Sequence, residues 1–366
     1  MMRKPLYIHV QMLFALLRVS LHDSKPELDI FNQVSDHEWK RCYKLAATQG
    51  VMALAWDGVM KLPKELQPPM AVKISWASGV ENYEKKYLHY CSTVDEVSRF
   101  YAEHGISTMQ LKGVGFSTLY PNPLHREGGD IDIYTYSADK NVMSDKEANT
   151  LADELMRQKG IKVDSEHSVK HSNFYYKGIS FENHKTFLNV ESYKIAVLVD
   201  KMLQEKMEPK LVKLKTGEVM IPSPQFNTLF IAFHAAQHYG SGLALHHLCD
   251  WAIILCRYGL QIPEEIKDQK LLAGIAAMTQ LCNKYLGTSQ PIEGGEGIAE
   301  EMMSEILSPR YSASLPTRNK IGILIYKTKR MLHSHRLKSK ILDSSLVETI
   351  YKSFISHICN PNSIFN

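Results

Sequence analysis

Two acidic residues, Asp130 and Asp132, stand on either side of an isoleucine in the stretch GGDIDIY. In an extended strand alternate side chains share a face, so both carboxylates point one way while Ile131 and Ile133 point the other. Neighbouring carboxylates raise each other's pKa unless a cation neutralises them, and Mg²⁺ prefers oxygen ligands of this kind. The pair therefore predicts a magnesium site on a strand; the alternative is a solvated strand edge.

A third acidic residue, Glu182, lies in the strand-like stretch ISFENH. On a neighbouring strand with the same facing, it would complete a set of three carboxylates. Such a set holds two metal ions about 3.5–4 Å apart, which clamp the attacking and leaving oxygens of a phosphoryl displacement. Asp130, Asp132 and Glu182 are therefore candidate metal ligands and catalytic residues for phosphoryl transfer.

A candidate phosphate site precedes the aspartates. Lys112, Gly113 and Gly115 follow an apolar, strand-like run at 106–111 and precede a short helical pattern. Glycine at such a junction lets backbone N–H groups approach a phosphate closely. Arg126 would suit bidentate contact with phosphate oxygens, and Lys112 would act as a point charge. For both cations the alternative is a solvated surface position.

Histidines gather in FIAFHAAQHYGSGLALHHLCDWAIIL. His234 and His238 stand one helical turn apart, which is a spacing that metal ligands use, and His246, His247 and Asp250 follow on the next helical segment. The HExxH arrangement of metalloproteases is absent, because no Glu follows the first histidine. The pattern favours side chains that line a cleft or pack within helices over a zinc site.

The elements that position these residues follow from periodicity. Residues 1–104 are almost entirely helical in pattern, and a long helix at 72–104 ends before Gly105, as expected for packing along the back of a sheet. Strands are expected at 106–111, 130–136, 161–165, 173–177 and 179–184, with helices at 114–119 and 145–159.

The remaining chain turns helical again. An extended connector at 218–224 interrupts helices expected at 188–206, 226–239, 243–258, 266–285 and 299–307. The fold class is therefore α+β, with a small mixed sheet between two helical regions. The predicted parts are an N-terminal helical region at 1–104, an α/β core at 105–187 and a C-terminal helical domain at 188–366.

Composition is that of an ordinary folded protein. Of 366 residues, 44% are hydrophobic and 22% charged, and a net charge of +4 is too small to indicate nucleic-acid binding by itself. Six cysteines without a C-x-x-C pair favour a reducing cytoplasm over a disulfide or zinc scaffold. No window approaches the roughly 18 apolar residues of a membrane span, and Arg18 closes the apolar N-terminal run, which predicts an amphipathic helix.

The segment at 318–340 predicts a basic amphipathic helix. Its cations are Lys320, Lys327, Lys329, Arg330, Arg336, Lys338 and Lys340. Such a helix could contact nucleic acid or an anionic membrane surface. It lacks the interleaved aromatic residues that single-stranded nucleic-acid sites use, so a solvated helix face is favoured over a nucleic-acid partner.

The motifs LKG, LYP, GDIDI and FENH together resemble the uncharacterised nucleotidyltransferase family of the polymerase-beta-like superfamily, over roughly residues 100–255. The resemblance implies a core sheet with two aspartates and a third acidic residue that bind magnesium and a nucleoside triphosphate. Asp130 and Asp132 match the paired metal ligands, and Glu182 matches the third acid.

One departure concerns the phosphate side. Gly113 matches the glycine of the turn, but the superfamily usually has Gly-Ser after the first strand, with the serine near the phosphates. Here the chain reads Lys112-Gly113-Val114-Gly115. Phosphate contact would therefore rest on backbone amides and on Lys112 or Ser117.

The expected activity is magnesium-dependent transfer of a nucleoside monophosphate from a triphosphate to an acceptor, with release of pyrophosphate. The acceptor could be a sugar, an antibiotic, a nucleic-acid end or a protein side chain. Two alternatives stay open: another phosphoryl transfer at the same site, of the kinase or toxin type, and a catalytically silent nucleotide- or RNA-binding protein on the same fold.

Overall fold

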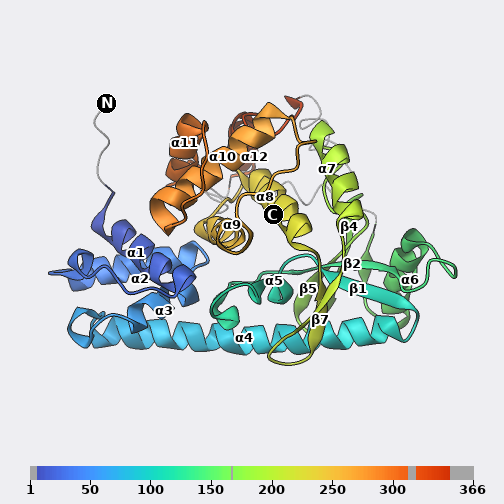
Figure 1. Ribbon diagram of the computed structural model, residues 1–366, viewed down its shortest axis with the longest axis horizontal. Coiled ribbons are helices and arrows are strands. Elements are labelled where there is room, and N and C mark those ends of the chain that lie inside the picture. The colour runs from blue at the N-terminus through green and yellow to red at the C-terminus, as the bar shows by residue number, and fades with distance from the viewer. Residues whose placement is uncertain (1–5, 166–167, 312–318, 347–366) are drawn as a thin grey trace.

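The computed structural model describes residues 6–165, 168–311 and 319–346 of the chain. A seven-stranded mixed sheet lies between an N-terminal and a C-terminal group of helices (Figure 1). The predicted α+β class with a mixed sheet flanked by helices is confirmed.

Three short helices begin the chain: α1 (Ile8–His22), α2 (Asp36–Thr48) and α3 (Met52–Met60). α2 and α3 contact the first half of α4 (Met70–Ala102), and α1 packs on α2 and α3. α4 has 33 residues and continues beneath the sheet (Figure 1). Gly105, with φ of +74°, follows this helix as predicted. Among the described residues, no helix is both long and apolar enough to cross a membrane.

The sheet has the strand order β3-β4-β5-β2-β1-β7-β6. The strands are β1 (Ile106–Gln110), β2 (Ile131–Ser137), β3 (Val163–Asp164), β4 (His171–Tyr176), β5 (Ile179–His184), β6 (Lys210–Lys213) and β7 (Glu218–Ile221). β2 runs parallel to β5, and β1 runs parallel to β7, while the other pairs are antiparallel. Lys177 and Gly178, both with positive φ, form the two-residue turn between β4 and β5.

The hairpin of β6 and β7 extends the sheet beyond the core predicted at 105–187. β7 pairs with β1 through Met109 and Met220. The segment at 218–224, which the sequence predicts to be an extended connector, therefore contributes a strand to the sheet. The sequence did not predict this hairpin because β6 is an exposed edge strand that carries Lys210 and Lys213. Its residues therefore lack the apolar alternation by which a strand is recognised. The boundary expected at Phe187 therefore leaves this hairpin out of the sheet to which it belongs.

Helices cover both faces of the sheet. α4 and α6 (Asp145–Gln158) bury the face that carries Ile131, Ile133 and Phe181. α7 (Lys194–Glu205) and α8 (Pro224–His238) rise from the opposite side (Figure 1). Burying a large aliphatic or aromatic side chain contributes about 1.5–3 kcal/mol, so these apolar positions fix which face each strand turns to its helices.

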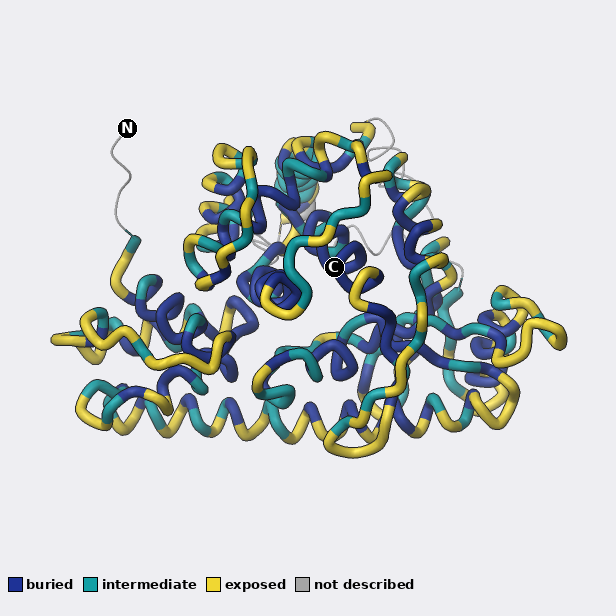
Figure 2. The backbone as a smooth tube through the Cα atoms, in the orientation of Figure 1, coloured by how far each residue is buried: buried dark blue, intermediate teal, exposed yellow. Residues whose placement is uncertain are grey.

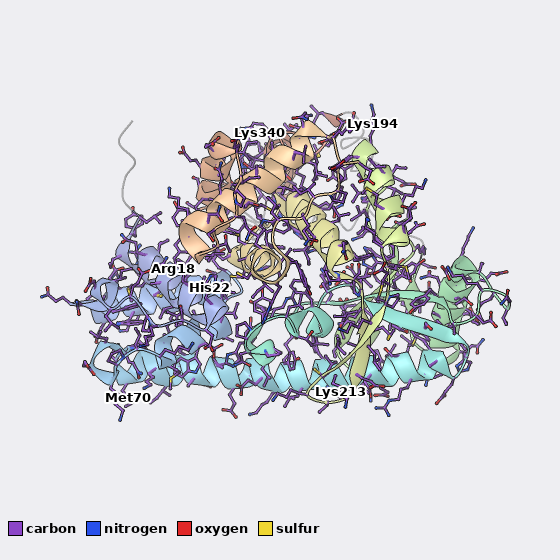
Figure 3. All side chains as sticks on the ribbon, in the orientation of Figure 1. Arg18, His22, Met70, Lys194, Lys213 and Lys340 are labelled. Carbon is purple, nitrogen blue, oxygen red and sulfur yellow. The ribbon has the colours of Figure 1, made fainter. Side chains whose placement is uncertain are left out.

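The other C-terminal helices form a second packed group. They are α9 (Leu245–Tyr258), α10 (Gln269–Leu281), α11 (Glu296–Leu307) and α12 (Lys320–Lys338), with a π-helical turn at Cys282–Leu286. α9 is largely buried along its length (Figure 2). Arg18 and His22, labelled in Figure 3, hydrogen-bond the carbonyls of Tyr285 and Leu286 and so join α1 to this group.

The predicted basic helix is present as α12, although Arg318 lies outside the described residues. Arg336 and Lys340 both form ion pairs with Glu301 of α11, at 3.0 and 2.6 Å. Burial lowers the pKa of Lys338 to about 8. Part of the positive charge of this helix is therefore used to hold it against α11.

Candidate active site

The three predicted acids lie at the centre of the sheet. Asp132 of β2 is the direct register neighbour of Glu182 on the parallel strand β5. Asp130 immediately precedes β2 and shares the facing of Asp132, while Ile131 and Ile133 point into the core on the other side. The alternation of acidic and apolar residues in GGDIDIY produces this arrangement.

The buried side-chain amide of Asn149 holds β2 and β5 in their register. The side-chain nitrogen of Asn149, on α6, donates to Thr135 Oγ1 and Asn183 Oδ1 at 3.0 Å and to the carbonyl of His184 at 2.8 Å. One helix residue thus holds both strands in register. Because a shift by one residue would turn every side chain to the other face, this network keeps the acids together.

The acids open into a cleft of about 590 Å³ between the sheet and the helices α8 and α9. Its lining comprises Lys112, Gly113, Arg126, Glu127, Gly128, Gly129, Asp130, Asp132, Lys170, His171, Glu182, His234, Gln237, His238, Ser241, Gly242, His246, His247 and Asp250. The cleft therefore unites the carboxylates with the histidine-rich segment, as the cleft-lining interpretation of the histidines predicts. Gly115 and Ser117 lie outside this lining.

Lys112 sits between the two aspartates. Its Nζ lies 3.1 Å from Asp132 Oδ2 and 3.6 Å from Asp130 Oδ1. Burial would raise the pKa of Asp132, but Lys112 and His184 hold it well below its usual range. Burial and the charge of Asp132 instead raise the pKa of Asp130. Lys112 thus stabilises the charge of Asp132 and leaves that of Asp130 poorly compensated.

His184 belongs to the acidic cluster, although the sequence assigned it no role. Its Nε2 lies 3.2 Å from Asp132 Oδ1 and 3.7 Å from Glu182 Oε2, and its Nδ1 lies 3.2 Å from the carbonyl of Thr186. Nδ1 therefore faces the carbonyl of Thr186, and Nε2 faces the two carboxylates. Burial raises the pKa of Glu182, but the hydrogen bond with His184 and the charges of His171 and His184 together outweigh it and lower that pKa. Its position two residues after Glu182, on the same strand face, was the available signal.

Lys170 is a second cation that the sequence did not single out. It immediately precedes β4 and lines the cleft. Burial lowers the pKa of its ammonium, while Asp132 and Glu182 act in the opposite direction. Two lysines from opposite sides of the acidic cluster therefore face the same space.

The glycine turn behaves differently from the expectation for a phosphate loop. Gly113 has φ +81° and ψ −140°, and an added Cβ would lie 2.7 Å from Gln110 Nε2. The amide of Gly115 donates to Gln110 Oε1 at 2.6 Å, and the hydroxyl of Ser117 donates to the carbonyl of Val114 at 2.6 Å. The Gly115 amide and the Ser117 hydroxyl, both predicted to contact phosphate, thus form hydrogen bonds within the protein instead.

Arg126 forms a buried ion pair with Asp250. Its Nε and Nη2 donate to the two carboxylate oxygens at 2.8 and 2.7 Å, and its Nη1 donates to the carbonyl of Gly113 at 3.3 Å. The hydroxyl of Tyr120 also donates to Asp250, at 2.6 Å. The guanidinium that was expected to contact phosphate therefore ties the glycine turn to α9.

His125 anchors the loop between the glycine turn and β2. Its Nδ1 lies 2.9 Å from Asp57 of α3, and its Nε2 lies 3.0 Å from Glu84 of α4. Burial lowers the pKa of His125, but the two carboxylates outweigh it and raise that pKa above its ordinary value. His125 thus joins three segments beside the cleft.

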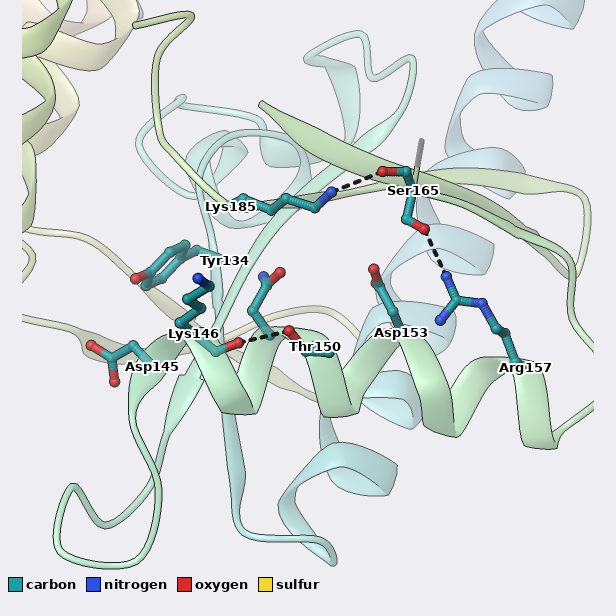
Figure 4. A pocket seen from close by; sticks show the side chains of 9 residues that line it. Tyr134, Asp145, Lys146, Thr150, Asp153, Arg157, Ser165 and Lys185 are labelled. Atoms are coloured by element: carbon teal, nitrogen blue, oxygen red, sulfur yellow. Dashed lines mark hydrogen bonds between the residues drawn. The ribbon is translucent and has the colours of Figure 1, made fainter. Parts of the chain in front are cut away.

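A second cleft, of about 530 Å³, lies along α6 (Figure 4). Its polar groups bond mainly to one another or to the sheet: Arg157 and Lys185 both donate to Ser165, at 2.8 and 3.0 Å. Asp153 accepts hydrogen bonds from Ser172 and Asn183. The described residues that line this cleft include no cluster of three carboxylates, so the first cleft is the candidate active site.

A family model described as uncharacterised nucleotidyltransferase matches residues 35–287. The chain belongs to this nucleotidyltransferase family. The match includes the whole cleft lining and confirms the resemblance carried by the sequence motifs. The nucleotidyltransferase is also similar to the crystal structure of an antigenic nucleotidyltransferase-like protein from Paracoccidioides brasiliensis, with 13% identity, a TM-score of 0.37 and coverage of 54% of this chain and 92% of that one. No curated protein matches the chain.

Nucleotidyltransferases generally use a nucleoside triphosphate and a divalent metal, and the residues of this cleft fit such an ion. Asp132, Glu182 and His184 place potential ligand atoms within 4.8 Å of one another. Asp132 Oδ2 is buried without a hydrogen bond among the described residues, and the Lys112 ammonium, 3.1 Å away, is its ion-pair partner. A buried carboxylate oxygen of this kind is costly unless a cation satisfies it.

Proposed function

We propose that this nucleotidyltransferase moves a nucleoside monophosphate from a nucleoside triphosphate to an acceptor, with magnesium held by Asp130, Asp132 and Glu182. The acceptor oxygen forms a bond to the α-phosphorus, and the bond from that phosphorus to the bridging oxygen of pyrophosphate breaks. Magnesium, when bound, neutralises charge on the phosphate oxygens and lowers the pKa of the attacking group.

The observation that carries the proposal is the register pairing of Asp132 with Glu182, with Asp130 on the same face immediately before β2. Hard oxygen ligands on two adjacent strands suit magnesium, which usually keeps several waters and binds through one or two carboxylates plus substrate phosphates. Asp130, at the cleft-facing start of β2, adds a third carboxylate from the more exposed side.

The phosphates would be held by lysines. Lys112 and Lys170 approach the acids from two sides, and both line the cleft. With the Gly115 amide and the Ser117 hydroxyl bonded within the turn, these ammonium groups are the cations best placed to contact a triphosphate. Arg126 supports this arrangement indirectly, through its bond to the carbonyl of Gly113.

The acceptor would lie toward the helical wall of the cleft. Glu182 is the more accessible carboxylate of the strand pair, since its side chain is 22% exposed against 2% for Asp132. We assign Glu182 to the attacking oxygen, whose proton passes to the carboxylate cluster. Gln237, Ser241 and the histidines of α8 and α9 form the opposite wall, where the acceptor would bind.

The reaction class can be tested with two labels. The protein is incubated with magnesium and a small-molecule extract, and with a triphosphate labelled either at the α- or at the γ-phosphate. We expect the α-label in a new product and the γ-label in pyrophosphate. Transfer of the γ-label would indicate a kinase reaction, and α-label transfer that survives Asp130→Ala would contradict the site assignment.

The alternative of a silent nucleotide- or RNA-binding protein predicts binding without transfer. A triphosphate that raises the melting temperature in magnesium, with no labelled product from any extract or RNA, would favour it. If no nucleotide shifts the melting temperature with or without magnesium, both proposals fail.

A further inference from the structure

Three imidazoles meet on the helical wall of the cleft. His234 and His238 project from successive turns of α8, and His247 projects from the first turn of α9. The ring centroid of His238 lies 4.6 Å from that of His234 and 4.7 Å from that of His247. One nitrogen from each ring lies within 4.8 Å of the other two.

We propose that His234, His238 and His247 form a binding site for a divalent transition-metal ion of the zinc class. Imidazole nitrogen suits zinc, whereas magnesium prefers oxygen, so this site differs in chemistry from the carboxylates on the sheet. Three protein ligands leave one coordination position open, as in catalytic zinc sites, and all three residues line the cleft. A water molecule or a donor atom of the acceptor can take that position.

The fold brings the third ligand to the first two. A short turn joins α8 to α9, and the backbone N–H groups of Ser241 and Leu243 both donate to the carbonyl of His238 at 2.9 Å. Gly240, with φ of +76°, packs so closely on Leu337 that an added Cβ would lie 3.0 Å from that side chain. The turn is therefore closely constrained, and it sets His247 against His238.

The imidazoles are prepared to bind a metal at neutral pH. Burial lowers the pKa of His238 to about 4, and it also lowers the pKa values of His234 and His247 well below the ordinary value. Neutral rings offer a lone pair without first losing a proton. The nearby ammonium groups of Lys112 and Lys170 also favour neutral rings.

A hydrogen bond to His247 competes with metal binding at this site. The amide of Ala244 donates to His247 Nδ1 at 3.2 Å as a helix cap. Ligation through Nε2 places the ring proton on Nδ1 and breaks this bond, while ligation through Nδ1 replaces it. Either route weakens metal affinity about fivefold, the equivalent of one capping interaction.

The carboxylate cluster is the competing location. His184, which belongs to that cluster, contacts Phe230 at 6.5 Å between ring centroids, and Phe230 stacks on His234 at 6.2 Å. One aromatic ring thus contacts a histidine of each group. A test must therefore show which group holds the metal, and variants of the two groups can do so.

The full-length protein is stripped with a chelator, and zinc affinity is measured against a chromophoric chelator. Cobalt(II) is added separately, because its visible d–d absorption reports tetrahedral nitrogen ligation. We expect one zinc ion per chain and a tetrahedral cobalt spectrum. His234→Ala and His238→Asn should each weaken zinc binding by more than about 100-fold, since even outer-shell changes cost 10–100-fold.

Two controls make the result specific. His246→Gln removes an adjacent imidazole of α9 that lies outside the group of three, and Asp132→Asn disables the carboxylate cluster; both should retain zinc. Thermal unfolding without metal checks that each variant is folded. Zinc binding that survives His238→Asn in the folded variant, that disappears with Asp132→Asn, or that is absent from the wild type would overturn the proposal. None of these outcomes depends on nucleotide transfer.

Discussion

Asparagine substitutions at Asp130 and Asp132 should have the same effect on activity and different effects on stability. Asp132 is 2% exposed and sits 3.1 Å from Lys112 Nζ and 3.2 Å from His184 Nε2, so its charge stabilises the fold. Asp130 is 36% exposed and lies 3.6 Å from the same lysine, and its raised pKa shows that its charge is poorly compensated.

The magnitudes follow from these contacts. Removing one partner of a buried ion pair costs about 3–5 kcal/mol. Because Lys112 keeps Asp130 as a second partner, we expect Asp132→Asn to lower the free energy of unfolding by about 3 kcal/mol, the lower end of that range. Asp130→Asn should change it by no more than about 0.5 kcal/mol, as for a partly exposed side chain without a strong partner.

The assay is urea unfolding followed by tryptophan fluorescence at neutral pH, with a chelator present to remove divalent ions. Magnesium-dependent transfer is measured on the same samples, and both variants should have lost it. Equal destabilisation by the two substitutions, or a larger loss for Asp130→Asn, would refute this view of how charge is distributed in the cluster.

Three further predictions concern the surroundings of the cleft. Gly113→Ala forces an L-residue into φ +81° and should cost about 1–3 kcal/mol, whereas Gly129→Ala, whose Cβ would meet nothing within 4 Å, should leave the melting temperature nearly unchanged. Asp250→Asn should cost about 3 kcal/mol by leaving the Arg126 guanidinium buried without its carboxylate, and a double-mutant cycle with Arg126→Gln should show coupling; additive losses would contradict the pairing. Because the pKa of His125 is raised on folding, its contribution is complete below about pH 6.5 and is lost as pH rises through the folded pKa, with a slope of at most about 1.4 kcal/mol per pH unit. His125→Gln should remove that slope in urea unfolding measured across pH, and an unchanged slope would refute the assignment.

Patterns of short range made much of the fold predictable. The alternation at 130–133 gave the facing of the acids, Lys177 and Gly178 marked the hairpin turn, and Gly105 marked the end of the long helix. Each of these signals comes from local backbone geometry, which the residue types specify directly.

Pairings over long sequence distances were not predictable from the chain. The ion pair of Arg126 with Asp250 joins residues 124 positions apart, and it turns an expected phosphate ligand into a support for the glycine turn. The roles of Lys170 and His184 likewise depend on how β4, β5 and β2 lie side by side. No local pattern encodes the contacts of Arg126, Asp250 and Lys170, because tertiary packing alone brings these groups together. For His184 the spacing from Glu182 gives the shared strand face, and its contact with Asp132 comes from the pairing of β5 with β2.

The central claim is that the carboxylates of β2 and β5 hold the metal that serves nucleotide transfer. The most direct test is a crystal structure with manganese and a triphosphate analogue that cannot be cleaved between its α- and β-phosphates. We expect an anomalous peak about 2.1 Å from oxygens of Asp132 and Glu182, with the triphosphate reaching Lys112. A nucleotide bound elsewhere, or a metal bound with none of the three acids as a ligand, would contradict it.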